Sequence, residues 1–236
     1  MQSSDNTLNY NAHTYGFDVQ GTSSMDTHLL KNTEWGIVAM LSHSKYGKYG
    51  NSSYLGVNKE IYQNKAEGYV TGMSNGTPSQ ELALTQVTYD TPNTGYGAST
   101  TGTIYGVYDM SGGAFKFVMG GYDKYSGRLS SNNSGFCGKL KDGTDFILDC
   151  VNWPDDKYVD VYTPDNGSIS YKFGDAIYET GGWYNDSWVY PNYTNIWYHR
   201  GGNITFVAPK TAGIFSSSAG SGGSSSIIGS RFAVKP

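Results

Sequence analysis

Side chains that could carry out catalysis are few in this chain of 236 residues, and their spacing matches none of the catalytic patterns considered. Ser, His and Asp are present, but no nucleophile-elbow motif places a serine on a sharp strand-to-helix turn. The histidines lack the paired spacing of metal ligands and are interpreted as surface or structural residues: His13, His28, His43 and His199. Cys137 and Cys150 flank residues 141–144, a turn-like sequence, so a cross-hairpin disulfide and two free thiols both remain open. The sequence thus predicts no enzyme, no metal site and no cofactor.

Recognition chemistry has more support, and it concentrates in residues 183–232. The first half of this segment is dense in Tyr, Trp and Asn and almost free of charge. Flat aromatic side chains with a polar tip bind at low entropic cost, and small polar side chains add adaptable hydrogen bonds. A stretch this aromatic is either core or a recognition surface. For Trp183, Trp188 and Trp197 we favour core positions.

The composition excludes several other functions. A net charge of −4 without a basic block argues against nucleic-acid binding. The chain has no run of 18 apolar residues that could span a membrane. The polar start, residues 1–6, forms no signal peptide, so either the protein works without secretion or an upstream segment was trimmed. The 32 Gly and 21 Tyr residues, with few charges, indicate an all-β or α+β protein with many turns and long loops.

The elements that must position the aromatic segment are visible in part. A helix is expected from a cap at Asn32 or Thr33 to about residues 42–44, with an apolar face of Trp35, Val38 and Ala39. We expect further apolar residues to widen this buried stripe: Leu29, Leu30, Ile37, Met40 and Leu41. Strands are expected near residues 15–19, 69–71, 155–162 and 227–234, and the Phe115, Lys116, Phe117 alternation predicts a half-buried strand.

Residues 106–118, which read Gly-Val-Tyr-Asp-Met-Ser-Gly-Gly-Ala-Phe-Lys-Phe-Val, resemble a motif of the formylglycine-generating-enzyme branch of the C-type lectin fold. Residues 200–202, Arg-Gly-Gly, and residues 229–232, Gly-Ser-Arg-Phe, look like two further elements of that branch, the last in altered order. The three motifs occur in the family's order. The resemblance implies one α+β domain of C-type lectin type over residues 1–236, with long loops and insertions.

The C-terminal part is most similar to the variable proteins of diversity-generating retroelements. Their pattern is an aromatic lead, Trp-x-x-Arg-Gly-Gly, then Ala-Gly-x-Phe, a Gly/Asn/Ser tract and a closing Arg, which residues 197–202, residues 212–215 and Arg231 match. That family mutates adenines of the gene and displays the variable residues on a C-type lectin scaffold. The resemblance therefore implies that residues 183–232 form a variable ligand-binding segment.

The same resemblance argues against catalysis and calcium binding. The enzymes of this branch need a pair of reactive cysteines late in the chain, and no cysteine follows Cys150. Family residues Asn and Glu, which help to hold a structural calcium ion, correspond to Gly113 and Lys116. An ammonium in place of a carboxylate is expected to abolish that site.

We expect the ligand-binding side chains to lie between structural anchors. Trp197 is expected to pack beneath the Arg-Gly-Gly turn, with Arg200 bonded to backbone carbonyls and Gly201 and Gly202 serving special backbone conformations. The predicted ligand-binding residues, all expected on the surface, are Tyr190, Asn192, Tyr193, Thr194, Asn195, Tyr198, His199, Asn203, Ile204, Thr205, Phe206 and Val207. Replacing Tyr193 and Tyr198 by Ala is expected to remove ligand capture and leave the melting temperature nearly unchanged.

The function implied is non-enzymatic binding of a macromolecular ligand, protein or glycan, on a cell or virion surface. The location implied is a phage tail or a bacterial cell surface, with no nucleic-acid partner and no direct membrane insertion. Two alternatives stay open. One is a structural pilin-like or tail-fibre subunit, and the other is a relative of the sulfatase-modifying enzymes.

Overall fold

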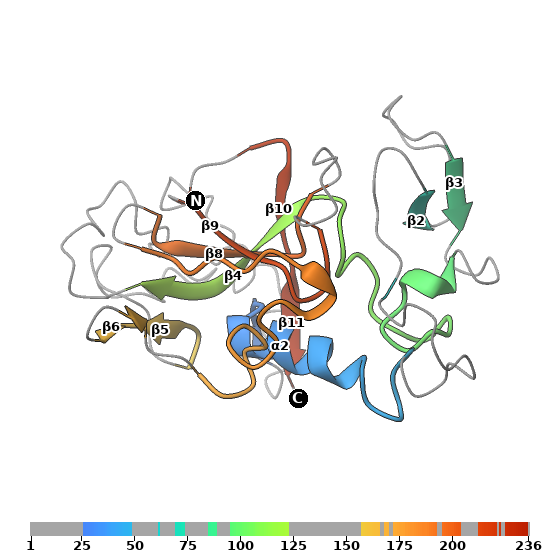
Figure 1. Cartoon of the computed structure of the whole chain (residues 1–236). Helices are drawn as coiled ribbons and strands as arrows, with labels where there is room; N and C mark the ends of the chain where they lie inside the picture. Colours follow the sequence, from blue (N-terminus) through green and yellow to red (C-terminus); the bar gives the residue numbers. More distant parts are fainter. Residues whose placement is uncertain are drawn as a thin grey trace.

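The computed structural model describes residues 26–48, 61, 69–73, 85–88, 95–122, 157–165, 168–169, 172–192, 195–203, 212–220, 222 and 225–235. Within these ranges the chain combines one α-helix, two 3-10 turns and eleven short strands, which confirms the α+β class (Figure 1). The strand expected near residues 15–19 and the two cysteines lie outside the described residues.

Helix α2 (Asn32–Leu41) forms where the sequence predicts it. Trp35 and Ala39 are fully buried and Val38 packs against the same core, so the predicted apolar face is confirmed. The predicted widening of this face is wrong at three positions, because Ile37, Met40 and Leu41 are exposed. The helix therefore buries a narrow stripe and presents a second apolar stripe outward.

The start of α2 differs from the expected cap. The Glu34 carboxylate accepts the Lys31 backbone N–H at 2.9 Å, so Lys31 rather than Asn32 or Thr33 precedes the helix. Glu34 also contacts Nε2 of the buried His28 at 3.0 Å. Asn32 is buried in the first turn, where its amide donates to the Tyr162 hydroxyl at 2.6 Å.

Strand β4 (Phe115–Tyr122) holds the middle of a five-stranded sheet. β8 runs antiparallel along one edge of β4, and β9 extends the sheet beyond β8. On the other edge, β10 and β5 pair in parallel with the first and last residues of β4. The bounds of these neighbours are Asp160–Tyr162 for β5, Trp197–Arg200 for β8, Ser217–Gly220 for β9 and Ile228–Ser230 for β10.

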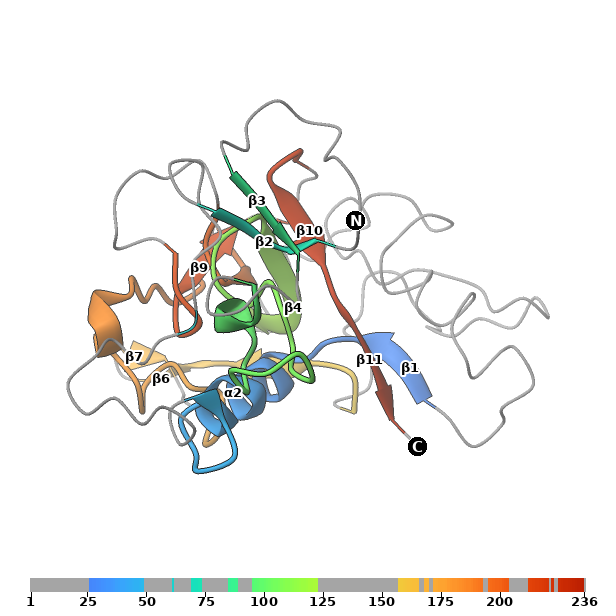
Figure 2. The same cartoon turned by 90° about the vertical axis from the view of Figure 1, so that its right-hand side faces the viewer.

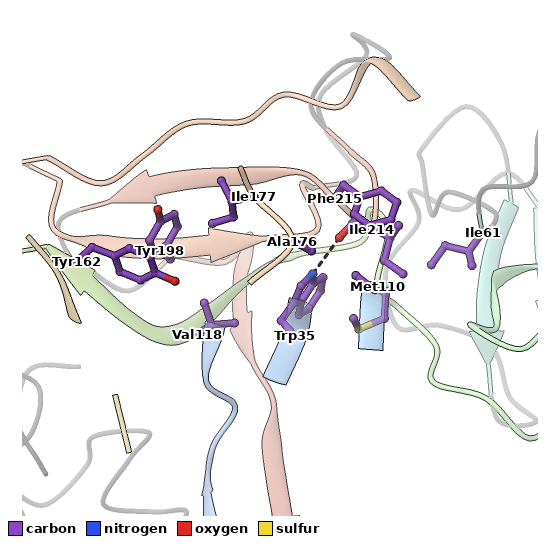
Figure 3. Close-up of a cluster of buried hydrophobic side chains, with 11 residues drawn as sticks. Trp35, Ile61, Met110, Val118, Tyr162, Ala176, Ile177, Tyr198, Ile214 and Phe215 are labelled. Carbon is purple, nitrogen blue, oxygen red and sulfur yellow. Dashed lines mark hydrogen bonds between the residues drawn. The ribbon is translucent and has the colours of Figure 1, made fainter. Parts of the chain in front are cut away.

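Both faces of this sheet are covered, so residues that alternate along a strand enter two different cores. One cluster contains Trp35, Tyr162, Tyr198 and Phe215, and the Trp35 indole donates to Ile214 O at 2.9 Å (Figure 3). The second cluster contains Leu29, Phe117, Met119, Ile196 and Trp197, among others. The strand predicted at residues 115–117 is confirmed as the start of β4, but its predicted half-buried character is wrong, because Lys116 is buried as well as Phe117.

Three strand pairs lie outside the central sheet. β1 (Asp26–Leu29) pairs antiparallel with β11 (Phe232–Lys235), side by side in Figure 2. β10 and β11 confirm a final strand region near residues 227–234. β2 (Tyr69–Met73) confirms the strand expected at residues 69–71 and pairs in parallel with β3 (Thr85–Thr88). The remaining short elements are β6 (Pro164–Asp165), β7 (Ser168–Ile169), η1 (Tyr96–Ala98) and η2 (Trp183–Asn185).

Candidate functional site

The segment from η2 to residue 189 carries a row of exposed large side chains. Trp183 is 44% exposed and Trp188 47% exposed, and Tyr184 and Val189 are exposed too. We call these four side chains the aromatic surface. They lie between Gly182 and Pro191, where the described chain forms no strand.

The backbone of Tyr184 is held in an unusual conformation that presents its ring. Its φ of 55° and ψ of 14° lie in the left-handed region, which costs a non-glycine residue roughly 1–2 kcal/mol. The ring stacks on the buried Phe215, with centroids 6.2 Å apart and planes 9° apart. These contacts fix one face of Tyr184 against the core and leave the rest of the side chain toward solvent.

His43, in the turn after α2, supports the same rings from behind. Its ring centroid lies 5.3 Å from that of Tyr184 and 5.9 Å from that of Trp183. The Ser42 hydroxyl donates to Ala39 O, so His43 Nδ1 donates to Ser42 and Nε2 accepts from the Tyr184 hydroxyl at 2.7 Å. Burial lowers the pKa of His43, which favours the neutral ring that this arrangement requires.

Residues 186–189 are hydrogen-bonded to Phe215 and to Ser217, the first residue of β9. The Asp186 carboxylate accepts the Phe215 N–H at 3.1 Å, and Ser187 O accepts the Ser217 N–H at 2.9 Å. Val189 N–H donates to both the backbone and side-chain oxygens of Ser217. Gly213 is required here because a Cβ would lie 2.0 Å from the Asp186 carboxylate oxygens. The aromatic surface is thus irregular in conformation but fixed at its base.

Strand β8 shows the opposite behaviour, and it corrects part of the predicted site. Tyr198 is 0% exposed, His199 7% and Asn203 0%, so the predicted surface positions of these three residues are wrong. For Tyr198 and His199 the reason is that β8 lies between β4 and β9 in a sheet covered on both faces. The Tyr198 ring meets Tyr162 at 4.8 Å on one face, and His199 meets Phe117 at 4.3 Å on the other.

The burial of the expected anchors of β8 is confirmed, but Trp197 packs at Gly222, and the indole at the Arg-Gly-Gly turn belongs to Trp35. The fully buried Arg200 donates from Nη2 to Ala176 O at 3.1 Å, as expected. Gly201 has a φ of +83°, and its Cα lies so close to Trp35 that a Cβ would meet the indole at 3.1 Å. Gly202 also has a positive φ, of 69°. These residues fix the turn from which the strand leaves the sheet.

Buried charges surround Arg200. Burial raises the pKa of Asp186 to about 7 and that of Asp175 to about 6, and the positive charge of Arg200 opposes both shifts. Asp175 accepts hydrogen bonds from the Tyr162 hydroxyl and the Ile177 N–H, both at 3.0 Å. These buried charges serve the packing of the frame, and Asp186 among them holds the base of the aromatic surface.

Of the other predicted site residues, three lie within the described residues and the rest do not. Tyr190 is partly buried against the core, Asn192 is exposed and Asn195 is half-buried. The Asn192 side chain accepts the Asn195 N–H at 3.0 Å, which forms a turn. The remaining predicted residues lie outside the described residues: Tyr193, Thr194, Ile204, Thr205, Phe206 and Val207.

The sequence reasoning missed Trp183 and Trp188, which we expected in the core. A signal was available, because Gly181-Gly182 precedes these residues, Pro191 follows them, and the residues between show no strand or helix period. Such segments are loops, and loops run over protein surfaces.

Among the described residues, no three His, Cys, Asp or Glu side chains are placed to share a metal ion. Over the same ranges, no helix has the length and apolarity needed to cross a membrane. Comparison of the chain with protein-family profiles, curated proteins and solved structures gives no match.

Proposed function

We propose that this chain is a non-enzymatic recognition protein that displays the aromatic surface on a C-type lectin scaffold. We assign it to the type of the variable proteins of diversity-generating retroelements, at a phage tail or a bacterial cell surface. The observation that carries the proposal is the contrast between exposed rings at 183–189 and the buried, hydrogen-bonded frame beneath them. Such a frame tolerates replacement of the outer side chains because the hydrogen bonds to Phe215 and Ser217 that hold its backbone do not depend on them.

The spatial relation of the three sequence motifs supports the scaffold assignment. Lys116 of the first motif is paired with Arg200 of the second on one side and with Gly229 of the third on the other. The Gly112 N–H also donates to Gly201 O at 2.6 Å. Three segments that are far apart in the sequence are thus in contact, as expected if they together form one structural unit of the scaffold.

The residues at the family's calcium position do not fit a calcium ion. Lys116 is buried and its ammonium donates to Gly112 O at 3.0 Å, so a positive charge already sits where hard oxygen ligands are needed. Burial lowers the pKa of Lys116 to about 8, while Asp109 opposes that shift. We therefore propose a scaffold whose motif is closed by an ammonium group instead of a divalent cation.

The aromatic surface suits a protein or glycan ligand bound without covalent chemistry. Partly exposed Trp and Tyr rings, already ordered by Phe215 and His43, lose little entropy on binding. Trp and Tyr are the residue types that most often dominate binding energy in such interfaces. Trp183 and Trp188 would supply constant anchors, and their neighbours would set the specificity.

Sequencing of the same locus from several isolates tests the proposal. The tryptophan codon TGG contains no adenine, so adenine mutagenesis leaves Trp183 and Trp188 unchanged. We expect substitutions confined to adenine positions between Tyr184 and Ser226, most frequent at exposed residues such as Tyr184 and Asn192 and rare at buried Tyr198 and Arg200. Substitutions spread evenly over the chain, or over all four bases, would contradict it and favour a structural tail-fibre or pilin-like subunit.

A binding measurement tests the site itself. Protein and glycan arrays are probed with the wild-type chain and with Trp188→Ser, and Phe173→Ser is the control because Phe173 is also exposed but lies outside the aromatic surface. We expect array signals that Trp188→Ser loses and the control keeps. Equal signals for all three proteins would reject the aromatic surface as the binding site.

A further inference from the structure

A groove of about 410 Å³ opens between the end of α2 and the loop that follows η1. In Figure 1 the blue turn after α2 lies beside the green loop at this place. The described residues that line the groove are Val38, Leu41, Ser42, Ser44, Tyr46, Gly47, Thr100, Thr101, Tyr105, Gly106 and Val107.

Backbone hydrogen bonds hold the two walls of the groove together. The Lys48 N–H donates to Thr100 O at 2.9 Å, which joins the turn to the loop. Within the loop, the Thr100 N–H donates to Val107 O at 3.1 Å, and the Val107 N–H donates to the Thr100 hydroxyl at 3.0 Å. The groove is therefore preformed, which lowers the entropic cost of filling it.

Apolar side chains at the groove are unusually exposed. Tyr105 is 86% exposed and Tyr46 73%, and Leu41 and Val107 are exposed as well. The outward stripe of α2, Ile37 and Met40 with Leu41, continues this apolar face along the helix. A contiguous exposed apolar face of this kind marks an interaction site more often than a row of isolated residues does.

Among the described residues, the lining of the groove is uncharged and two of its sequence neighbours are lysines. Lys45 lies between the lining residues Ser44 and Tyr46, with its ammonium 4.8 Å from the Tyr46 ring centroid. The Lys48 stem packs at Gly102, where a Cβ would meet its Cγ at 3.2 Å. Lys45 and Lys48 thus adjoin the described lining in the chain, and that lining is uncharged and mainly apolar.

We propose that this groove binds an extended protein segment in which one aromatic or aliphatic side chain is flanked by carboxylates. The apolar side chain enters between Leu41 and Val107 and stacks with the exposed tyrosines, and the carboxylates face Lys45 and Lys48. This site is separate from the aromatic surface and does not depend on the function proposed for it. His43 lies between the two, because it follows the groove residue Ser42 and packs on Tyr184.

The test uses the whole ¹⁵N-labelled chain and three synthetic peptides. The first is acetyl-Asp-Glu-Phe-Glu-Asp-amide, the second has Ser in place of Phe, and the third has Lys in place of all four acids. We expect the first peptide to shift the amide signals of Ser44, Gly47, Thr101 and Val107 in a saturable way, with an affinity at least about tenfold above the other two. We expect 0.5 M NaCl to weaken the binding, because the lysines are at the surface and a Debye length at that ionic strength is only about 4 Å.

Two variants and a matched control sharpen the test. Val107→Glu places a negative charge in the groove, and Lys45→Ala with Lys48→Ala removes the positive rim, so both are expected to lower the affinity for the first peptide at least about fivefold. Lys157→Ala is the control, because Lys157 lies over the Tyr158 ring at the same 4.8 Å as Lys45 over Tyr46, but elsewhere. Thermal melting of each protein checks that the variant retains the fold.

Three results would overturn the proposal. One is equal binding of the Lys peptide, and another is a set of shifts that maps to residues 183–189. The third is concentration-dependent self-association that Val107→Glu abolishes, because the groove is then an interface between copies of this chain. Trp188→Ser is expected to leave peptide binding unchanged. The peptide experiment and the array experiment can therefore reject their two proposals independently.

Discussion

Residues 183–192 and residues 195–203 have similar compositions and opposite environments. Both carry Trp, Tyr and Asn with little charge, yet Trp188 is exposed and Trp197 is buried. The difference follows from pairing: β8 has a strand on each edge and a core on each face, whereas the earlier segment pairs only at scattered points with residues 215–217. Aromatic content therefore marks a segment for burial or recognition, and the sheet decides which.

The largest expected effect comes from Tyr198→Ala, which replaces our original prediction of an unchanged melting temperature. The ring is fully buried between Tyr162 and the core around Trp35, so truncation leaves a cavity. We expect the free energy of unfolding to fall by about 3–5 kcal/mol, measured by urea denaturation. Tyr198→Phe is the control, because the Tyr198 hydroxyl makes no hydrogen bond to any described residue, and it is expected to stay near wild type. A wild-type stability for the Ala variant would show that β8 is not buried.

Gly201→Ala is expected to have the second largest effect. The added Cβ meets the Trp35 indole at 3.1 Å, and the φ of +83° strains any L-residue. We expect a loss of about 1–3 kcal/mol in the free energy of unfolding. Gly229→Ala gives the comparison, because a Cβ there has no neighbour within 4 Å. Similar losses at both positions would contradict the role assigned to the Arg-Gly-Gly turn.

Acidification tests the two segments through their histidines. Burial lowers the pKa of His199 to about 4, so the unfolded chain, with a pKa near 6.5, binds more protons between those values. His199 therefore costs stability as the pH falls from about 6.5 toward 4, by about 2 kcal/mol at pH 5. We expect His199→Gln to remove this cost, seen as a smaller difference between urea midpoints at pH 7.5 and pH 5.

The same measurement on His43→Gln is the comparison, because burial lowers the pKa of His43 as well, beneath the aromatic surface. We expect a smaller change than at His199. Asp175 and Asp186, whose pKa values are raised, add stability as the pH falls, but they contribute equally to all these proteins. If the pH dependence of stability changed more for His43→Gln than for His199→Gln, β8 would not be the more deeply buried of the two segments.

Trp188→Ser is expected to have the smallest effect on stability. Its ring is 47% exposed and contacts Tyr190 edge-on at 5.7 Å, so we expect a change within about 1 kcal/mol in the free energy of unfolding. Calorimetric melting measures this change alongside the array signal. A loss comparable to that of Tyr198→Ala would place Trp188 in the core and remove the contrast between the segments.

Local signals predicted local structure well. The helix at residues 32–41, its buried Trp35 and Ala39, the strands near residues 69 and 228–235, and the structural roles of Trp197, Arg200 and Gly201 all follow from residue types and short spacings. Such features depend on contacts within a few residues or on one strong preference, such as glycine at positive φ.

The burial of β8 and Lys116 and the exposure of one α2 face were not predicted, because they depend on contacts between distant parts of the chain. Nothing near His199 or Tyr198 in the sequence shows that β4 and β9 will flank them, because these partners come from residues 115–122 and 217–220. Lys116 reads as an outward residue of an alternating strand, yet the carbonyl of Gly112 satisfies its ammonium inside the protein. The outward stripe of α2 looks like core because the sequence alone does not show which face the sheet covers.

The left-handed backbone at Tyr184 determines how much stability is lost when another residue replaces it. Asn, Asp and Gly adopt that conformation with less strain than an aromatic residue does, and the first two can hydrogen-bond locally. A shuffled library at this codon should therefore return those three residues in well-folded clones, and β-branched residues only in unstable ones. The backbone geometry of this one turn would in this way limit which side chains can occur at position 184, before selection for binding acts on them.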